Sequence, residues 1–101
     1  APKKCTILGK TWKIVRYKKH IKIPGGHALG TCDTEKCLIK LYTGMDGQQI
    51  KDTLLHEVTH AIDETLALEL TEQQVHALAG ALYGLFQDNP KLVNWMLGDN
   101  A

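Results

Sequence analysis

The 101-residue sequence lacks a long apolar run, internal repeats and low-complexity tracts. No stretch approaches the roughly 20 apolar residues of a membrane-spanning helix, so we expect no membrane partner. The opening stretch also lacks the continuous apolar segment of a secretory signal. This length favours one small domain spanning residues 1–101, with a thin hydrophobic core.

Three cysteines are too few for a disulfide-rich scaffold and for a four-cysteine zinc site. Cys32 and Cys37 could pair across a hairpin, which would leave Cys5 alone. We favour the alternative of three reduced thiols in a cytoplasmic protein, because disulfides persist mainly in oxidising compartments.

The net charge of +1 conceals two oppositely charged halves. Residues 1–42 carry ten lysine or arginine side chains against two carboxylates, a formal charge of +8. Residues 43–101 carry two lysines against nine carboxylates, a formal charge of −7. The sequence therefore predicts a polarised molecule with one basic and one acidic part.

The basic part, residues 1–44, has the alternating pattern of short strands. ILGKTWKIVRYKK predicts two strands around Gly9, and ALGTCDTEKCLIKLY predicts a second hairpin with its turn at residues 33–36. The Pro-Gly-Gly segment at residues 24–26 predicts an irregular connection that interrupts any regular element.

The acidic part, residues 45–101, has a helical period. Asp46 can cap a helix that extends to about Leu66, and Thr71 has the capping-box interval that begins a second helix. Pro90 ends that helix and opens a short third one. The apolar residues expected to face the core are Ile50, Leu54, Val58, Ala61 and Ile62, then Val75, Leu78, Ala79, Leu82, Leu85 and Phe86, with Trp95 and Met96 as caps.

The predicted fold class is α+β. A small, mostly antiparallel sheet of two hairpins should be followed by a long helix, a second helix antiparallel to it, and a short C-terminal helix.

The HEVTH motif at residues 56–60, inside the first predicted helix, is the strongest chemical signal. Histidines four positions apart leave one helical face, so the imidazoles of His56 and His60 can both reach one zinc ion. Glu57 points to a neighbouring sector and can act as a general base without being a ligand. The alternative is a pair of exposed histidines beside an ordinary glutamate.

A catalytic zinc site usually has a third protein ligand. The next residues on the same helical face are too far from the metal to be its third ligand, because eight residues of helix rise about 12 Å. Asp63 is better placed as a hydrogen-bond partner for His60. Candidates beyond the turn are Glu69, Glu72 and His76. We favour Glu72, because the first turn of a helix stabilises a carboxylate and a loop positions Glu69 less firmly.

His76 lies one turn beyond Glu72 on the same face. It could orient Glu72, donate a hydrogen bond to a developing oxyanion, or be the third ligand itself. A solvated helix histidine without such a role is the alternative.

The two helices around the motif resemble those of the small HExxH proteins found in bacteriophage and prophage genomes. They are similar, more distantly, to the ImmA/IrrE-type metallopeptidases and the minimal gluzincins. The resemblance covers roughly residues 28–97, and its specific part is TLLHEVTHAIDETLALELTEQQVHALAGALYGLFQDNP.

This resemblance implies a zincin-like zinc metallopeptidase in which His56, His60 and Glu72 bind the metal and Glu57 is the base. The implied activity is hydrolysis of peptide bonds: zinc activates a water, and Glu57 takes its proton and passes it to the leaving amine. An extended peptide substrate could pair with an edge strand, at residues 27–32 or 37–42.

A different function is suggested by the basic segment TWKIVRYKKHIK. It places Trp12 and Tyr17 among five basic residues, a composition found on nucleic-acid-binding sheets. The chain would then be a nucleic-acid-binding protein or a catalytically silent interaction protein that keeps a zinc fold. A third interpretation is a solvated strand face whose lysines discourage edge pairing.

Overall fold

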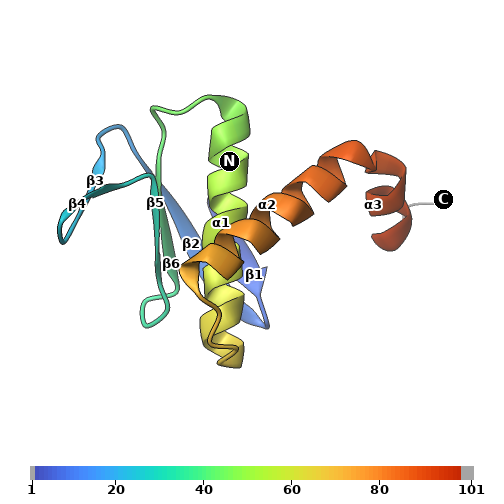
Figure 1. Cartoon of the computed structure of the whole chain (residues 1–101), viewed down its shortest axis with the longest axis horizontal. Helices are drawn as coiled ribbons and strands as arrows, with labels where there is room; N and C mark the ends of the chain where they lie inside the picture. Colours follow the sequence, from blue (N-terminus) through green and yellow to red (C-terminus); the bar gives the residue numbers. More distant parts are fainter. Residues whose placement is uncertain (1, 99–101) are drawn as a thin grey trace.

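The structure of the chain is a computed structural model that describes residues 2–98. Its strands are β1 (Lys4–Ile7), β2 (Lys10–Tyr17), β3 (Ile21–Ile23), β4 (Gly26–Ala28), β5 (Gly30–Asp33) and β6 (Leu38–Tyr42), and its helices are α1 (Gly47–Leu66), α2 (Glu72–Asp88) and α3 (Pro90–Met96). Helix α1 packs on one face of a sheet, and α2 crosses α1 (Figure 1). The predicted α+β fold class is confirmed.

The main sheet has the strand order β1-β2-β6-β5. Its two outer pairs, β1–β2 and β5–β6, are the predicted antiparallel hairpins, and the turn of the second occupies residues 34–37, one position later than expected. The central pair, β2–β6, is parallel and sets Tyr17 opposite Tyr42. Strand β6 is therefore interior, so the prediction of residues 37–42 as an edge was wrong, and the edge strands are β1 and β5.

A second, two-stranded sheet is formed by β3 and β4, which pair antiparallel. The prediction that residues 24–26 interrupt regular structure holds for Pro24 and Gly25, and it was wrong for Gly26, which begins β4. Pro24 and Gly25 make the two-residue turn between the strands, and Gly25 has φ 85°. Proline followed by a glycine of positive φ suits the middle of a type II turn, so the segment joins two strands.

The hydrophobic core lies between the main sheet and α1. Its sheet side includes Trp12, which is 1% exposed, so the predicted use of this ring by a nucleic acid was wrong: alternation along β2 places it on the core face. The α1 residues expected to face the core do pack against it: Ile50, Leu54, Val58, Ala61 and Ile62.

The limits of α1 and α2 follow from their caps. The Asp46 side chain accepts a hydrogen bond from the Gln49 backbone N–H at 2.8 Å, and α1 ends where Ala67 adopts a left-handed conformation. Thr71 and Gln74 form a complete capping box at the start of α2. The predicted helix boundaries are therefore confirmed, because they depend on local hydrogen bonds.

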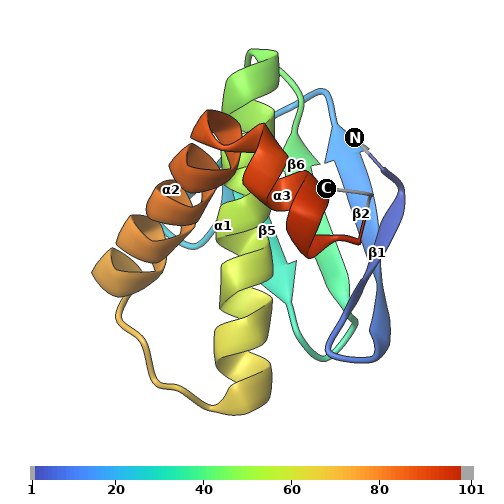
Figure 2. The same ribbon diagram turned by 90° about the vertical axis from the view of Figure 1, so that its right-hand side faces the viewer.

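The second half of α2 and all of α3 project away from the sheet (Figure 1). Because α2 runs obliquely across α1 (Figure 2), only Val75 and Ala79 of α2 are buried. The prediction that Trp95 and Met96 cap the core was wrong, and Trp95 is 63% exposed. Three α2 residues that were expected inside are also exposed: Leu78, Leu85 and Phe86. None of the helices within residues 2–98 combines the length and hydropathy needed to cross a bilayer.

Candidate metal centre

Two histidines of α1 and the first residue of α2 converge on one point. His56 Nε2 lies 2.9 Å from Glu72 Oε1, and His60 Nε2 lies 3.0 Å from Glu72 Oε2. The ring centroids of the histidines are 4.8 Å apart, as four-residue spacing on one helical face requires. One donor atom from each of the three side chains falls within 4.8 Å of the others.

This donor set fits a zinc ion. Tetrahedral zinc with ligand bonds of about 2.0–2.1 Å separates neighbouring donors by roughly 3.3 Å, close to the histidine–carboxylate distances here. Two imidazoles and a carboxylate are also the ligand types that zinc takes in catalytic sites. Within residues 2–98, no fourth histidine, cysteine, aspartate or glutamate joins the group.

The connection between the helices determines where Glu72 lies. Asp63, buried on α1, accepts a hydrogen bond from the Leu70 backbone N–H through Oδ1 at 3.0 Å. Its backbone carbonyl accepts a second one from the Leu68 N–H. Asp63 thus contacts the linker and not His60, the partner expected from the sequence. The linker then enters the Thr71 capping box, which orients the first turn of α2.

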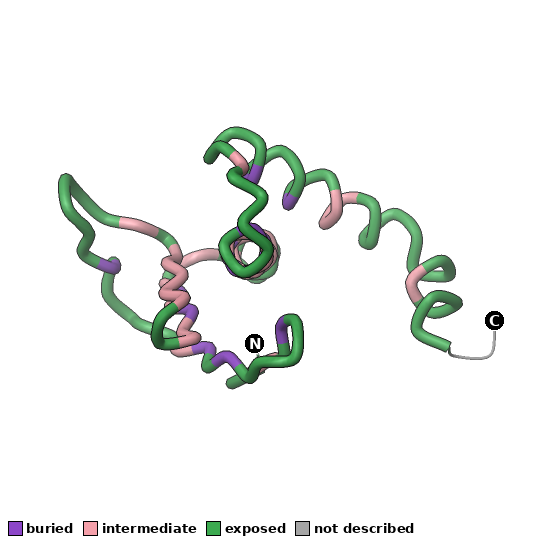
Figure 3. The backbone as a smooth tube through the Cα atoms, turned by 90° about the horizontal axis from the view of Figure 1, so that it is seen from below, coloured by how far each residue is buried: buried purple, intermediate pink, exposed green. Residues whose placement is uncertain are grey.

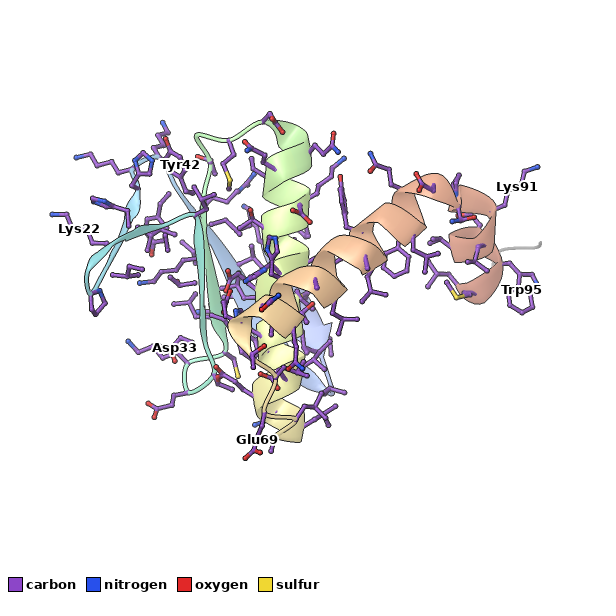
Figure 4. All side chains as sticks on the ribbon, in the orientation of Figure 1. Lys22, Asp33, Tyr42, Glu69, Lys91 and Trp95 are labelled. Atoms are coloured by element: carbon purple, nitrogen blue, oxygen red, sulfur yellow. The ribbon has the colours of Figure 1, made fainter. Side chains whose placement is uncertain are left out.

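Glu69, the alternative ligand in the linker, is not part of the donor group. Its side chain lies beyond the end of α1, at the far tip of the linker (Figure 4). Its backbone has φ 60°, which turns the chain before α2 begins.

Glu57 lies beside the donor group without belonging to it. Its side chain is only 6% exposed, and burial, helped by the negative charge of Glu72, raises its pKa from 4.5 to about 7. The carboxylate lines a cleft of about 620 Å³, together with His56, His60 and Glu72. A carboxylate so placed can accept and release a proton inside the cleft.

Gly30 on β5 brings the edge strand close to Glu57. A Cβ at this position would lie 2.9 Å from Thr53 Cγ2 and 3.1 Å from Glu57 Oε2. Only glycine leaves room for β5 to lie this close to α1, and Gly30 was not among the residues singled out from the sequence. The available signal was a glycine at the start of a strand, which often marks a close backbone approach.

His76 lines the same cleft from α2. Its ring centroid is 5.8 Å from that of His56, and it is solvent-exposed. It is not a member of the donor group, so its geometry favours a contact with a bound molecule over metal ligation.

Cys32 also lines the cleft, from β5. Burial, followed by the charges of Glu64 and Glu57, raises the pKa of its thiol from 9.0 to about 12. Cys5, Cys32 and Cys37 are all free, so the hairpin disulfide considered from the sequence is not formed.

Comparison of the chain with protein-family models, with curated proteins and with solved structures finds no match in any of the three.

Proposed function

We propose that this protein is a zinc-dependent peptidase of the HExxH type. The observation that carries the proposal is the convergence of His56, His60 and Glu72 beside a buried carboxylate that is not a ligand. A purely structural zinc site is usually closed by four protein ligands. This donor group has three, which favours a site with room for a reacting molecule.

The metal and the glutamate have separate roles in this proposal. A zinc ion held by the three ligands would supply a Lewis acid that polarises the scissile carbonyl and acidifies a water. Glu57 accepts the proton of the attacking water and delivers it to the leaving nitrogen as the C–N bond breaks. Its exclusion from the donor group keeps the carboxylate free for both transfers.

Strand β5 supports a peptide as the substrate. It is one of the two edge strands of the main sheet and, unlike β1, lines the cleft, along Gly30, Thr31 and Cys32. An extended chain can add to such an edge through main-chain hydrogen bonds. Since Gly30 brings this edge against Glu57, a peptide bound there has its backbone near the base, and His76 can donate a hydrogen bond from the opposite wall.

The test compares the wild type with Glu57→Gln and Glu72→Gln. We expect one zinc per chain in the wild type and in Glu57→Gln, with cleavage of a mixed peptide library by the wild type alone. Glu72→Gln should lose most of its zinc affinity. Glu69→Gln is the matched control, because it removes a nearby carboxylate outside the donor group and should change neither zinc content nor cleavage.

A wild type that holds zinc and cleaves no peptide would contradict the proposal. The chain would then be an interaction protein that keeps a zinc fold.

A further inference from the structure

The main sheet has one face that no helix covers. Helix α1 lies against the other face, and α2 and α3 lie beyond α1 (Figure 3). Alternation along the strands assigns residues to the two faces: Trp12 and Ile14 of β2 and Ile39 and Leu41 of β6 are buried against α1. The uncovered face, called the outer sheet face below, carries Lys4, Lys13, Val15 and Tyr17 of β1 and β2, Leu38, Lys40 and Tyr42 of β6, and Thr31 and Asp33 of β5, together with neighbouring threonines.

The outer sheet face carries more positive than negative charge, because Lys4, Lys13 and Lys40 outnumber its carboxylate, Asp33. Lys4 and Lys13 are direct partners across β1 and β2, and Lys40 lies on the neighbouring strand β6. Lys18, Lys19 and Lys22 follow at the end of β2 and on β3, beside this face, and Lys22 projects outward in Figure 4. Within residues 2–98, no lysine or arginine forms an ion pair with a carboxylate. Such a surface attracts a polyanion.

Aromatic rings accompany these lysines. Tyr17 and Tyr42 are partners in the parallel pair, and Lys40 Nζ lies 5.7 Å from the centroid of the Tyr17 ring. The His20 ring stacks on Tyr42 at 4.2 Å between centroids, with 23° between planes, and His27 meets His20 edge to face. Tyr17 is 39% exposed, which leaves a ring available to a ligand.

We propose that the outer sheet face binds single-stranded nucleic acid. Phosphates would contact Lys13, Lys40 and their neighbours, and unstacked bases would stack on Tyr17 and on the His20–Tyr42 pair. Rings at a sheet surface can reach bases only when these are not already paired and stacked, which favours a single strand over a duplex. An anionic membrane fits less well, because the strands of this face offer no exposed large aliphatic side chain for insertion.

The primary test is fluorescence anisotropy of a labelled twelve-nucleotide oligothymidylate, titrated with the whole chain at several NaCl concentrations. If about four phosphates are neutralised, the affinity should fall roughly 50-fold between 50 and 200 mM salt. An affinity that does not change with salt overturns the proposal.

Two charge-reversal variants provide a matched comparison. Lys13→Glu/Lys40→Glu and Lys51→Glu/Lys91→Glu alter the net charge equally, but Lys51 and Lys91 lie on α1 and α3. The first pair should weaken binding about tenfold or more, and the second less than about twofold. Equal weakening by both pairs overturns the proposal, because only net charge would then matter.

The stacking contribution is tested at Tyr17. Tyr17→Ala should weaken binding about fivefold or more, whereas Tyr17→Phe should retain the wild-type affinity. Equal binding of dextran sulfate, or tighter binding of phosphatidylserine vesicles, would identify a different partner and overturn the proposal. None of Lys13, Lys40 and Tyr17 lines the metal cleft, so any of these failures leaves the peptidase proposal intact.

Discussion

Asp63 of α1 and Leu70 of the linker are joined by a hydrogen bond of 3.0 Å, from the Leu70 backbone N–H to Asp63 Oδ1. Asp63 lies about one turn after His60 on α1, and Leu70 lies two residues before Glu72. It therefore connects the helix that supplies two candidate ligands to the segment that positions the third. Asp63 is a positioning residue in this arrangement.

Removing this acceptor should weaken the metal centre. We expect Asp63→Ala to lower zinc affinity about tenfold or more, as loss of a supporting contact does in other metal sites. It should also lower the free energy of unfolding by about 1 kcal/mol, because a half-buried N–H loses its partner. Chelator competition and urea denaturation measure the two effects. Asp63→Asn retains an acceptor oxygen and should recover much of both, and wild-type zinc affinity in Asp63→Ala would rule out the positioning role.

A side chain at Gly30 should separate β5 from the base. Gly30→Ala places a methyl group against Thr53 and Glu57, so we expect a loss of about 1–3 kcal/mol in unfolding free energy from overpacking. Peptide cleavage should fall more than zinc affinity, since no ligand contacts this position. Gly80→Ala is the control: nothing lies within 4 Å of its added Cβ, and alanine in a helix should leave stability equal or higher. A Gly30→Ala variant with the cleavage rate of the wild type would show that the close approach is dispensable.

The Cys32 thiol should make stability depend on alkaline pH. In the folded chain the pKa of this thiol is about 12, against 9.0 ordinarily, so between these values the unfolded chain ionises while the native chain stays protonated. The contribution of the protonated thiol to the free energy of unfolding is complete below pH 9 and is lost as the pH rises toward 12. Between pH 8 and pH 10, the urea midpoint of unfolding should therefore fall more for the wild type than for Cys32→Ala. Identical falls in both proteins would contradict this prediction.

The backbone at the C-terminal end of α1 is strained at Ala67, and a substitution can relieve this strain. Ala67 adopts φ 52° and ψ 48°, a left-handed conformation that costs alanine more than glycine. Ala67→Gly should raise the unfolding free energy by about 1 kcal/mol, measured by urea denaturation. The same exchange at the exposed helical position Ala81 should lower it by about 0.5–1 kcal/mol. A decrease in both variants would exclude the C-cap explanation.

Local features could be predicted from the sequence. The HEVTH spacing, the Asp46 cap and the Thr71 capping box act over three or four residues, and each is present in the structure. The sequence also favoured Glu72 over Glu69 as the third ligand, because the first turn of a helix positions a side chain more firmly than a linker does. These inferences depend on interactions within about one helical turn.

Features that depend on distant parts of the chain could not be predicted. The parallel pairing of β2 with β6 decides which strand is the edge, and no local pattern encodes it. Because α2 crosses α1 obliquely (Figure 2), it carries α3 away from the core, and Trp95 of α3 is exposed. The sequence around Trp95 is nevertheless typical of a helix that covers a core. The need for glycine at position 30 becomes visible only when β5 lies against α1.

The parallel ladder between β2 and β6 also bears on the order of folding. Each hairpin has a short turn and can form within microseconds, whereas the ladder joins Lys13 to Leu38 and must close a longer loop first. Strand β5 packs on α1 and pairs with β6, so it takes its place when the second hairpin docks. We therefore expect the rate-limiting barrier to be the docking of one preformed hairpin on the other, with the cleft between β5, α1 and α2 completed afterwards.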